Sequence, residues 1–366
     1  MIIDSCFVVT TPFQIITAIN LTLHHKTETD LFIVPQFKNA EDVAKRIAET
    51  NVFRRVIYVN TDSIEKYKKN KSRLLRHLGI ARNYLGIETV ISSFYPKDIR
   101  YSNIYISSKA NIGRLMVLYY LKMNYDFKVI CFDDGEASYD NIDIIRPTKL
   151  DRILQRLCFK RTVYEKAEDL LLYSPDLFFK LNKSSSFHIS AIPPIRTDEE
   201  FRGLMNFIFG FSESDSIKER VIILDILKEG NLLDGEEKKL LDAYEMICSH
   251  YGENDVIIKR HPRDKGEEKP IYRYFKNYSI PFEVVLMNMD LNKTVIVSVG
   301  TTALVLPKLL FGVQPRVLYL GKMIKTKQNT KIGHSYYEAC KALYDCADLF
   351  FMPESIDELS DYLKEN

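Results

Sequence analysis

The chain has 366 residues, 46% hydrophobic and 27% charged, which is typical of a globular protein rather than a disordered one. This length exceeds what one compact core usually holds, so we expect two domains. Lys and Arg number 51, and Asp and Glu number 49. The net charge of +2 argues against a nucleic-acid-binding protein, which needs a clustered basic excess.

The six cysteines are scattered, and no two of them form a CxxC pair. This pattern disfavours a disulfide framework and a structural zinc site, and it predicts a reducing compartment. No apolar run reaches the roughly 20 residues that span a bilayer. The first residues lack the basic and long apolar regions of a signal peptide, so we expect a soluble cytoplasmic protein.

The first half of the chain alternates short apolar runs with longer amphipathic segments. Residues 6–10 predict a strand, Thr11 and Pro12 a turn, and residues 13–23 a helix. Further strands are predicted at 31–34, 56–59, 104–107, 129–132 and 170–173. Short apolar strands separated by helices of this kind predict a parallel α/β sheet.

Residues 183–216 are polar and contain Pro193 and Pro194, so we place the linker between two domains there. The domains are then 1–195 and 216–366. In the second, strands are predicted at 221–224, 256–259, 294–297 and 316–320, and helices at 236–249, 303–311 and after the capping-box pair Ser355 and Glu358. Two α/β halves predict a ligand cleft between them.

Two adjacent carboxylates follow the strand predicted at 129–132. Gly135 allows a sharp turn that presents Asp133 or Asp134. Such a group is suited to serve as a general base if burial or like-charge repulsion raises its pKa. The alternative is an Asp-Gly turn without a chemical role, since these residues favour turns on conformational grounds.

A histidine among cations follows a predicted strand of the second half. His261 lies beside Lys259, Arg260 and Arg263, so this segment is suited to bind an anion. The cations are expected to lower the pKa of the imidazole unless a bound anion reverses the effect. His261 is therefore a candidate donor of a hydrogen bond or proton to a phosphate leaving group, and Pro262 supports this interpretation because it fixes the turn that follows the histidine. A solvated basic turn is the alternative.

A third segment joins a strand to a helix and ends in hydroxyl-bearing residues. Gly300, Thr301 and Thr302 stand where the first helical turn offers free backbone N–H groups to a phosphate. Helix capping by a threonine, without any ligand, is the alternative. The three segments together supply a base, an acid and an anion site.

Missing motifs disfavour several common enzyme classes. GxGxxG, GxxxxGK[ST] and GxSxG are absent, which argues against Rossmann dehydrogenases, P-loop kinases and α/β-hydrolases. The histidines show no metal-ligand spacing, and no Asp-X-Asp pair is present to clamp a diphosphate through a metal. His334 is interpreted as part of a surface loop.

Two basic stretches, 66–76 and 149–166, are interpreted as solvated helix faces. Contact with an anionic membrane surface is the alternative. The 22 tyrosines and 21 phenylalanines leave material for an interface such as that of a homodimer.

The ordered series Thr10-Thr11-Pro12-Phe13-Gln14, Asp133-Asp134-Gly135, His261-Pro262 and Thr301-Thr302-Ala303-Leu304 resembles the motif set of bacterial sialyltransferases. Specifically, it resembles glycosyltransferase family 52 and its polysialyltransferase relatives. Each motif is short, so the order and spacing over most of the chain carry the resemblance. It implies the GT-B fold, in which two Rossmann-like domains face each other across a ligand cleft.

The resemblance implies an inverting transfer of sialic acid from CMP-sialic acid to a galactoside hydroxyl, with no cofactor and no essential metal. The acceptor would be a bacterial surface glycan that ends in galactose, in capsule or lipooligosaccharide. The enzyme would be cytoplasmic, with peripheral contact at the inner face of the plasma membrane as an option. Alternatives are a polysialyltransferase, another CMP-ulosonic-acid transferase, a GT-B-like sugar-nucleotide epimerase or hydrolase, and a non-catalytic sugar-nucleotide-binding protein.

The family's functional positions carry over residue by residue. The implied catalytic residues are Asp134, Asp133 and His261. The implied donor-binding residues are Lys259, Pro262, Arg263, Glu283, Gly300, Thr301 and Thr302. Of these, Lys259 and Glu283 match positions that hold the cytidine base and ribose in similar enzymes. The first domain would then carry the base and the acceptor, and the second the CMP-sugar.

One loop departs from the family pattern. Some members place a catalytic carboxylate in a Pro-containing loop after the first strand of the second domain. The corresponding loop here, 224–230, has no proline and has Lys228 near the expected acid. The general base therefore stays open, and we favour Asp134 among four carboxylates: Asp133, Asp134, Asp225 and Glu229.

Overall fold

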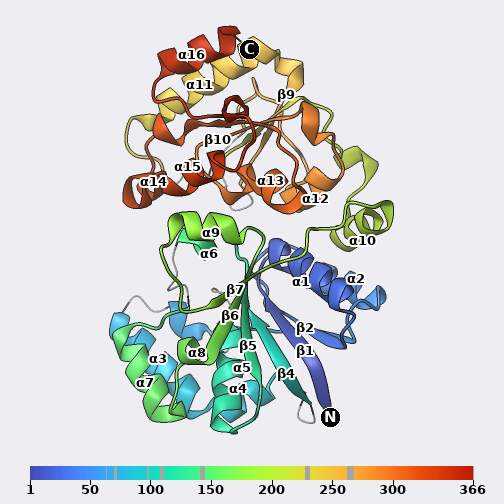
Figure 1. Ribbon diagram of the computed structural model, residues 1–366, viewed down its shortest axis with the longest axis vertical. Helices are drawn as coiled ribbons and strands as arrows, with labels where there is room; N and C mark the ends of the chain where they lie inside the picture. Colours follow the sequence, from blue (N-terminus) through green and yellow to red (C-terminus); the bar gives the residue numbers. More distant parts are fainter. Residues whose placement is uncertain are drawn as a thin grey trace. The chain divides into compact units, whose positions relative to one another are not determined.

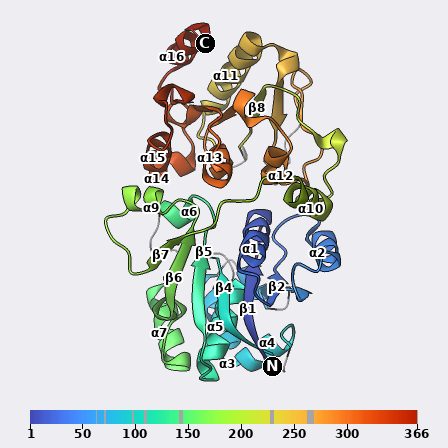
Figure 2. The same cartoon turned by 45° about the vertical axis from the view of Figure 1, so that its right-hand side comes forward.

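The computed structural model describes residues 1–62, 64–69, 72–96, 99–107, 111–140, 145–226, 231–261 and 268–365 (Figure 1 and Figure 2). The chain divides into two compact units, Met1–Pro193 and Pro194–Asn366. Each unit has its own parallel β-sheet, and helices occupy the connections between strands. None of the described helices is long and apolar enough to cross a membrane.

The N-terminal unit contains a seven-stranded sheet in the order β3-β2-β1-β4-β5-β6-β7, and all neighbouring strands are parallel. The carboxyl ends of its strands therefore lie along one edge of the sheet. The strands are β1 (Ile2–Val9), β2 (Thr29–Ile33), β3 (Arg55–Tyr58), β4 (Arg100–Ile106), β5 (Lys128–Phe132), β6 (Ala167–Leu172) and β7 (His188–Ala191). The helices are α1 (Pro12–His25), α2 (Ala40–Glu49), α3 (Arg73–Leu85), α4 (Ile87–Ser92), α5 (Asn111–Lys122), α6 (Ala137–Asp140), α7 (Lys149–Phe159), α8 (Val163–Lys166) and α9 (Pro175–Leu181).

The first strand and helix show how local sequence builds the carboxyl edge of this sheet. The end of β1 is fully buried, and α1 begins immediately after it. The Thr11 hydroxyl caps α1 by accepting from the Gln14 backbone N–H at 3.4 Å. Pro12 occupies the first helical turn, where its missing N–H costs nothing. This short connection places Gln14 close to the strand ends.

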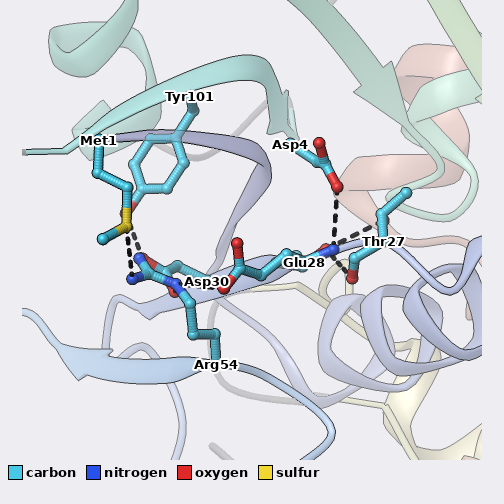
Figure 3. Close-up of polar contacts among 8 residues, drawn as sticks. Met1, Asp4, Thr27, Glu28, Asp30, Arg54 and Tyr101 are labelled. Atoms are coloured by element: carbon cyan, nitrogen blue, oxygen red, sulfur yellow. Dashed lines mark hydrogen bonds and ion pairs between the residues drawn. The ribbon is translucent and has the colours of Figure 1, made fainter.

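A polar cluster fixes the opposite, amino edge of the same sheet (Figure 3). Asp30, at the start of β2, is fully buried, and both of its carboxylate oxygens accept from the Arg54 guanidinium. The Tyr101 hydroxyl, from β4, donates to the same carboxylate at 2.6 Å. The Arg54 guanidinium also contacts Met1 Sδ at 3.9 Å. A buried carboxylate needs this compensation, so we interpret the cluster as structural.

The C-terminal unit contains a five-stranded parallel sheet in the order β12-β11-β10-β8-β9. Its strands are β8 (Val221–Leu224), β9 (Val256–Lys259), β10 (Val295–Ser298), β11 (Arg316–Tyr319) and β12 (Phe350–Phe351). Its helices are α10 (Glu199–Phe209), α11 (Glu236–Tyr251), α12 (Phe282–Met287), α13 (Leu306–Phe311), α14 (Lys327–Ile332), α15 (Ser335–Lys341) and α16 (Ile356–Glu365). The apolar strands pack under α11 and α16 in one continuous core.

The segment predicted as a linker, 183–216, contains regular structure instead. Strand β7 pairs with β6, and helix α10 begins after its N-cap Asp198. Phe201, Met205 and Ile208 are buried at helical spacing on α10. The polar residues around them conceal this apolar stripe in the sequence.

Two predicted helices are interrupted. The helix predicted at 149–166 is divided. Helix α7 ends at Phe159 because its C-cap, Lys160, has a left-handed backbone conformation, and Thr162 starts α8 with a capping box. The helix predicted at 303–311 begins as a separate 3₁₀ turn, Thr302–Leu304. Its α-helical part starts only at Leu306, because Pro307 is accommodated in a first turn but not in a helix interior.

Candidate active site

Asp133, directly after β5, is buried and its carboxylate is held by three donors. Oδ1 accepts from the Gly135 backbone N–H at 2.8 Å. Oδ2 accepts from the Tyr139 hydroxyl at 2.5 Å and from the Tyr173 backbone N–H at 3.2 Å. Burial raises the pKa of Asp133 to about 6, against the opposing effect of these hydrogen bonds. With 1% of its surface exposed, Asp133 holds the turn and is not presented to a substrate.

Asp134 is partly exposed, and it lies against the first motif of the chain. Its Oδ1 accepts from Gln14 Nε2 at 2.5 Å, and its backbone N–H donates to the Ser138 hydroxyl at 2.8 Å. Gln14 Oε1 accepts from the backbone N–H of Thr10 at 2.6 Å. Because that N–H can only donate, it fixes which end of the Gln14 amide faces Asp134. The carboxylate is thereby held in one orientation at the edge of the sheet.

The end of β6 forms the neighbouring part of this edge. The Tyr173 hydroxyl lies 3.0 Å from the Thr17 hydroxyl, and its ring packs against Phe13. The Tyr139 hydroxyl accepts from the Ser174 backbone N–H at 3.2 Å. Hydrogen bonds thus join the segments that follow β1, β5 and β6 along the carboxyl edge of the sheet. Gln14 and Tyr173 were not assigned roles from sequence; the only signal for Gln14 was its place in the first motif.

In the C-terminal unit, Lys259 is the last residue of β9 and is 5% exposed. Its Nζ donates to the Ile280 carbonyl at 3.2 Å and lies 5.0 Å from the centre of the Phe275 ring. Burial lowers the pKa of Lys259 to about 8, although the negative charge of Glu283 opposes this effect. Burial in turn raises the pKa of Glu283, on the first turn of α12. The structure therefore brings these two predicted residues into electrostatic contact.

His261 and Arg260 follow β9 and are partly exposed. The Arg260 guanidinium lies 5.9 Å from the centre of the Tyr278 ring, and the Tyr278 hydroxyl donates to Glu268. The sequence predicts three cations around His261. One of them, Lys259, is instead directed to a backbone carbonyl in the interior.

The third predicted segment follows β10. The Ser298 hydroxyl donates to the Leu224 carbonyl at 2.9 Å and accepts from the Gly300 N–H at 3.3 Å. The Thr301 hydroxyl caps the 3₁₀ turn by accepting from the Ala303 N–H at 3.3 Å. Capping by a threonine, the alternative to a phosphate role, is therefore present here. Strand β8 lies between β9 and β10, so this segment and His261 follow strands that are not neighbours.

An aromatic group beside this segment was missed in the sequence. The Tyr319 hydroxyl, at the end of β11, lies 2.9 Å from His334 Nδ1. The Tyr337 ring stacks on Tyr319 with a centroid distance of 4.2 Å. His334 is half-buried in the short connection between α14 and α15, and burial lowers its pKa. A side chain at Gly300 would meet the Tyr337 hydroxyl at 3.6 Å, which places these rings next to the third segment.

The remaining predicted residues contribute less to a site. Asp225, after β8, is 7% exposed, and its Oδ1 accepts from the Tyr244 hydroxyl at 3.0 Å, which suits a structural role better than a catalytic one. Among the described residues, no group of three or more His, Cys, Asp or Glu side chains is placed to hold a metal ion. Four residues considered from sequence lie outside the described residues: Lys228, Glu229, Pro262 and Arg263.

Solved glycosyltransferases share this fold. The crystal structure of TcCGT1 in complex with UDP aligns with 100% of this chain and 90% of that chain, with a TM-score of 0.54 and 12% identity. Phytolacca americana UGT2 complexed with UDP-2fluoro-glucose and pterostilbene aligns with 100% and 90%, with a TM-score of 0.53 and 10% identity. The two Rossmann-like units are those of the GT-B class, which confirms the predicted fold.

The model of the alpha-2,8-polysialyltransferase family matches residues 5–319. This range covers most of the chain and contains all the motifs described above, so the protein belongs to the alpha-2,8-polysialyltransferase family. The predicted relation to polysialyltransferases is thereby confirmed, and it supports a glycosyltransferase of the sialyltransferase type. Membership of glycosyltransferase family 52 itself stays a prediction. No curated protein matches the chain.

Proposed function

We propose that the protein transfers sialic acid from CMP-sialic acid to a hydroxyl of a glycan, with inversion at the anomeric carbon. The observation that carries this proposal is the pairing of Asp134 with Gln14 at the carboxyl edge of the N-terminal sheet. It joins two motifs far apart in the sequence, within a chain of the alpha-2,8-polysialyltransferase family. Ligand sites in α/β folds form at this edge.

Asp134 acts as the general base in this proposal. It accepts the proton of the acceptor hydroxyl while the hydroxyl oxygen bonds to the anomeric carbon of sialic acid. The bond from that carbon to the phosphate oxygen breaks, and CMP leaves with the electron pair. Asp134 suits this role better than Asp133 because it is partly exposed, whereas both oxygens of Asp133 are occupied inside the turn.

The C-terminal unit binds the donor in this proposal. His261 donates a hydrogen bond or proton to the departing phosphate, and Thr301 and Thr302 bind its oxygens. Lys259 and Glu283 hold the cytidine and its ribose. Burial lowers the pKa of Lys259 and raises that of Glu283, and each charge opposes the effect of burial on the other, which supports a joint role for the two residues in holding an uncharged base. Pro262 and Arg263 complete the predicted donor set.

Two acceptors are proposed. The sequence resemblance points to a galactoside at the end of a bacterial surface glycan, such as capsule or lipooligosaccharide. The family match favours a second candidate, a chain that already ends in sialic acid and is extended by α-2,8 linkage. The two differ in outcome: a single addition in the first case, and a ladder of products in the second.

Ligand-induced stabilisation of the purified protein tests the donor. We expect CMP and CMP-sialic acid to raise the melting temperature, and UDP and GDP to leave it unchanged, because only a ligand of the folded state stabilises it. Stabilisation by UDP alone would overturn the donor assignment. Mass spectrometry after incubation with CMP-sialic acid and either lactose or a sialylated oligosaccharide then distinguishes the two acceptors.

A substitution separates an enzyme from a non-catalytic nucleotide-binding protein. We expect His261→Ala to reduce turnover by about 10²–10⁴-fold, the usual contribution of a general acid, with an unchanged melting temperature of the ligand-free protein. CMP-dependent stabilisation in the absence of any sugar transfer, by the wild-type protein with either acceptor, would favour the non-catalytic alternative.

A further inference from the structure

Helices α3 and α7 hold an unusual share of the exposed apolar side chains. Seven of the fourteen large hydrophobic residues that are exposed among the described residues lie on these two helices. They are Leu74, Leu75, Leu78, Leu85, Leu150, Ile153 and Leu157. Contiguous apolar patches of this kind mark interaction surfaces, whereas isolated exposed residues do not. We call this surface the α3–α7 face.

The helical spacing shows that the face is a true apolar stripe. On α3, Leu74, Leu78 and Leu85 follow an i, i+4, i+11 pattern, which places them on one side of the helix. On α7, Leu150, Ile153 and Leu157 follow an i, i+3, i+7 pattern. A stripe with this period normally packs into a core, yet Leu157 is 78% exposed and Leu78 is 57% exposed.

Helices α3 and α7 lie side by side (Figure 1). The side chains that join them come from the sides opposite the leucines, and the leucines themselves are exposed. The Tyr84 hydroxyl of α3 donates to Asp151 of α7 at 2.6 Å, and Gln155 Nε2 donates to the same hydroxyl at 3.2 Å. The Tyr84 ring meets Phe159 edge-on at 5.5 Å. The only acidic residue of α7 is thus used between the helices.

Charge complements the leucines. Residues 66–85 contain seven Lys and Arg and no acidic residue, and residues 149–161 contain five Lys and Arg and one Asp. These two segments carry a net charge of +11 within a chain of +2, so the remainder carries −9. Exposed cations on and beside the two helices include Arg76, Arg82, Lys149, Lys160 and Arg161.

We propose that the α3–α7 face docks on the surface of an anionic lipid bilayer. The leucines enter the boundary between head groups and acyl chains, and the surrounding cations contact lipid phosphates. An open pocket between the helices, lined by Leu74, His77, Thr148, Lys149 and Leu150, leaves room for a head group. This inference concerns membrane attachment and does not depend on the proposed donor or acceptor.

Two other occupants fit the face less well. A second copy of the chain would bring two strongly cationic surfaces together, which repel each other. A soluble polyanion such as an acidic glycan would satisfy the cations, but it would gain nothing from a stripe of exposed leucines. Only a bilayer with an anionic surface and an apolar interior uses both features.

Vesicle flotation with the full-length protein tests the proposal. We expect the protein to float with vesicles of phosphatidylcholine and phosphatidylglycerol, and not with phosphatidylcholine alone. Leu78→Gln with Leu157→Gln keeps the charge and should weaken binding by at least about tenfold, because two apolar side chains no longer leave water. The matched control, Met123→Gln with Ile271→Gln, removes exposed apolar residues elsewhere and should bind as wild type does.

A second pair of variants tests the charge. Arg76→Gln with Arg82→Gln should weaken binding to the anionic vesicles by about fivefold for each cation lost. The matched control, Lys238→Gln with Lys325→Gln, removes two exposed cations elsewhere and should bind as wild type does. If the arginine variant binds vesicles more weakly but the leucine variant binds them as well as wild type does, the proposal is overturned in favour of a soluble polyanion. Equal binding to both kinds of vesicle, or none, would also overturn it. Sugar transfer to a soluble acceptor should stay unchanged in all four variants, so failure here is distinct from failure of the proposed activity.

Discussion

Asp30 and Asp134 lie at opposite edges of the same sheet, and they differ in how far water reaches them. Asp30, at the amino edge, is fully buried and held by the Arg54 guanidinium and the Tyr101 hydroxyl (Figure 3). Asp134, at the carboxyl edge, is partly exposed and held by the neutral amide of Gln14. The Arg54 cation compensates a carboxylate that is removed from water, whereas the Gln14 amide orients a carboxylate that water still reaches. The first arrangement stabilises strands, and the second suits a base.

Asp133 shows that the difference between Asp30 and Asp134 comes from the surroundings of each carboxylate and not from the sheet edge on which it lies. It adjoins Asp134, yet it resembles Asp30 in being buried with several donors. The acidic motif therefore divides its tasks between two neighbours. Asp133 stabilises the turn after β5, and Asp134 is presented by that turn.

The largest expected effect is on catalysis. Asp134→Asn should reduce turnover by about 10²–10⁴-fold, because the amide cannot accept the proton of the acceptor hydroxyl. Urea unfolding and the CMP-induced melting shift should match the wild-type protein. Asp133→Asn is the matched control, and it should lower the free energy of unfolding because it replaces an acceptor of three hydrogen bonds. Retained turnover in Asp134→Asn would remove the distinction between the two carboxylates.

The amino edge should respond in the opposite way. Arg54→Met leaves the buried Asp30 carboxylate without its cation, which usually costs about 3–5 kcal/mol of unfolding free energy. The measurement is urea unfolding, followed by turnover per folded molecule under native conditions. We expect turnover to be unchanged, since the cluster lies at the edge away from Asp134. A specific loss of turnover without a loss of stability would contradict the structural interpretation.

Tyr139→Phe tests the structural role of Asp133 through the pH dependence of unfolding. In the wild-type protein, the pKa of Asp133 is about 6 against the ordinary value of 3.8, so the folded state binds this proton more tightly than the unfolded state. Its contribution to stability therefore falls as pH rises between these two values and is then constant. Removing the Tyr139 donor raises this pKa further.

The cost of Tyr139→Phe should consequently depend on pH. We expect a loss of about 1.5–3 kcal/mol when Asp133 is ionised, as for a hydrogen bond to a charged group, and a smaller loss when it is protonated. Urea unfolding at pH about 8 and pH about 4 measures both values. An equal loss at the two pH values would show that the hydroxyl does not interact with the Asp133 charge.

The sequence was informative where local pattern decides the structure. The strands ending at Val9, Phe132 and Lys259 are apolar runs buried on both faces, and their positions were predicted within a few residues. Helix α10 and strand β7 were missed because polar residues surround their buried side chains. Patterning alone identifies an apolar stripe but does not say what covers it.

The α3–α7 face illustrates that limit. An amphipathic basic helix was predicted at 149–166 with its charges in solvent, and the natural expectation from periodicity is that Leu150, Ile153 and Leu157 face a core. They are exposed instead, because Gln155 and Phe159 on the opposite side make the contacts with α3. Only tertiary packing decides which side of α7 is buried against α3 and which side is exposed.

The candidate site was predicted unevenly for a related reason. Asp134 could be proposed because a carboxylate after a strand is a local signal, but nothing local distinguishes it from Asp133. The distinction comes from the Tyr173 N–H after β6 and the Tyr139 hydroxyl on α6, which the fold brings to Asp133. Gln14 was part of a motif with no assigned task, because its partner is 120 residues away.

The smallest expected effect separates orientation from chemistry at Asp134. Gln14→Ala removes the amide donor, so the Asp134 carboxylate becomes less well oriented toward the acceptor hydroxyl. We expect about a tenfold lower turnover per folded molecule, which is about 1.4 kcal/mol in activation free energy. Gln14→Glu keeps an acceptor for the Thr10 N–H but replaces the amide donor with a second carboxylate beside Asp134, so it should lower turnover further. If both variants lower turnover equally, and only in proportion to a loss of unfolding free energy, Gln14 supports the fold of the edge and not the base.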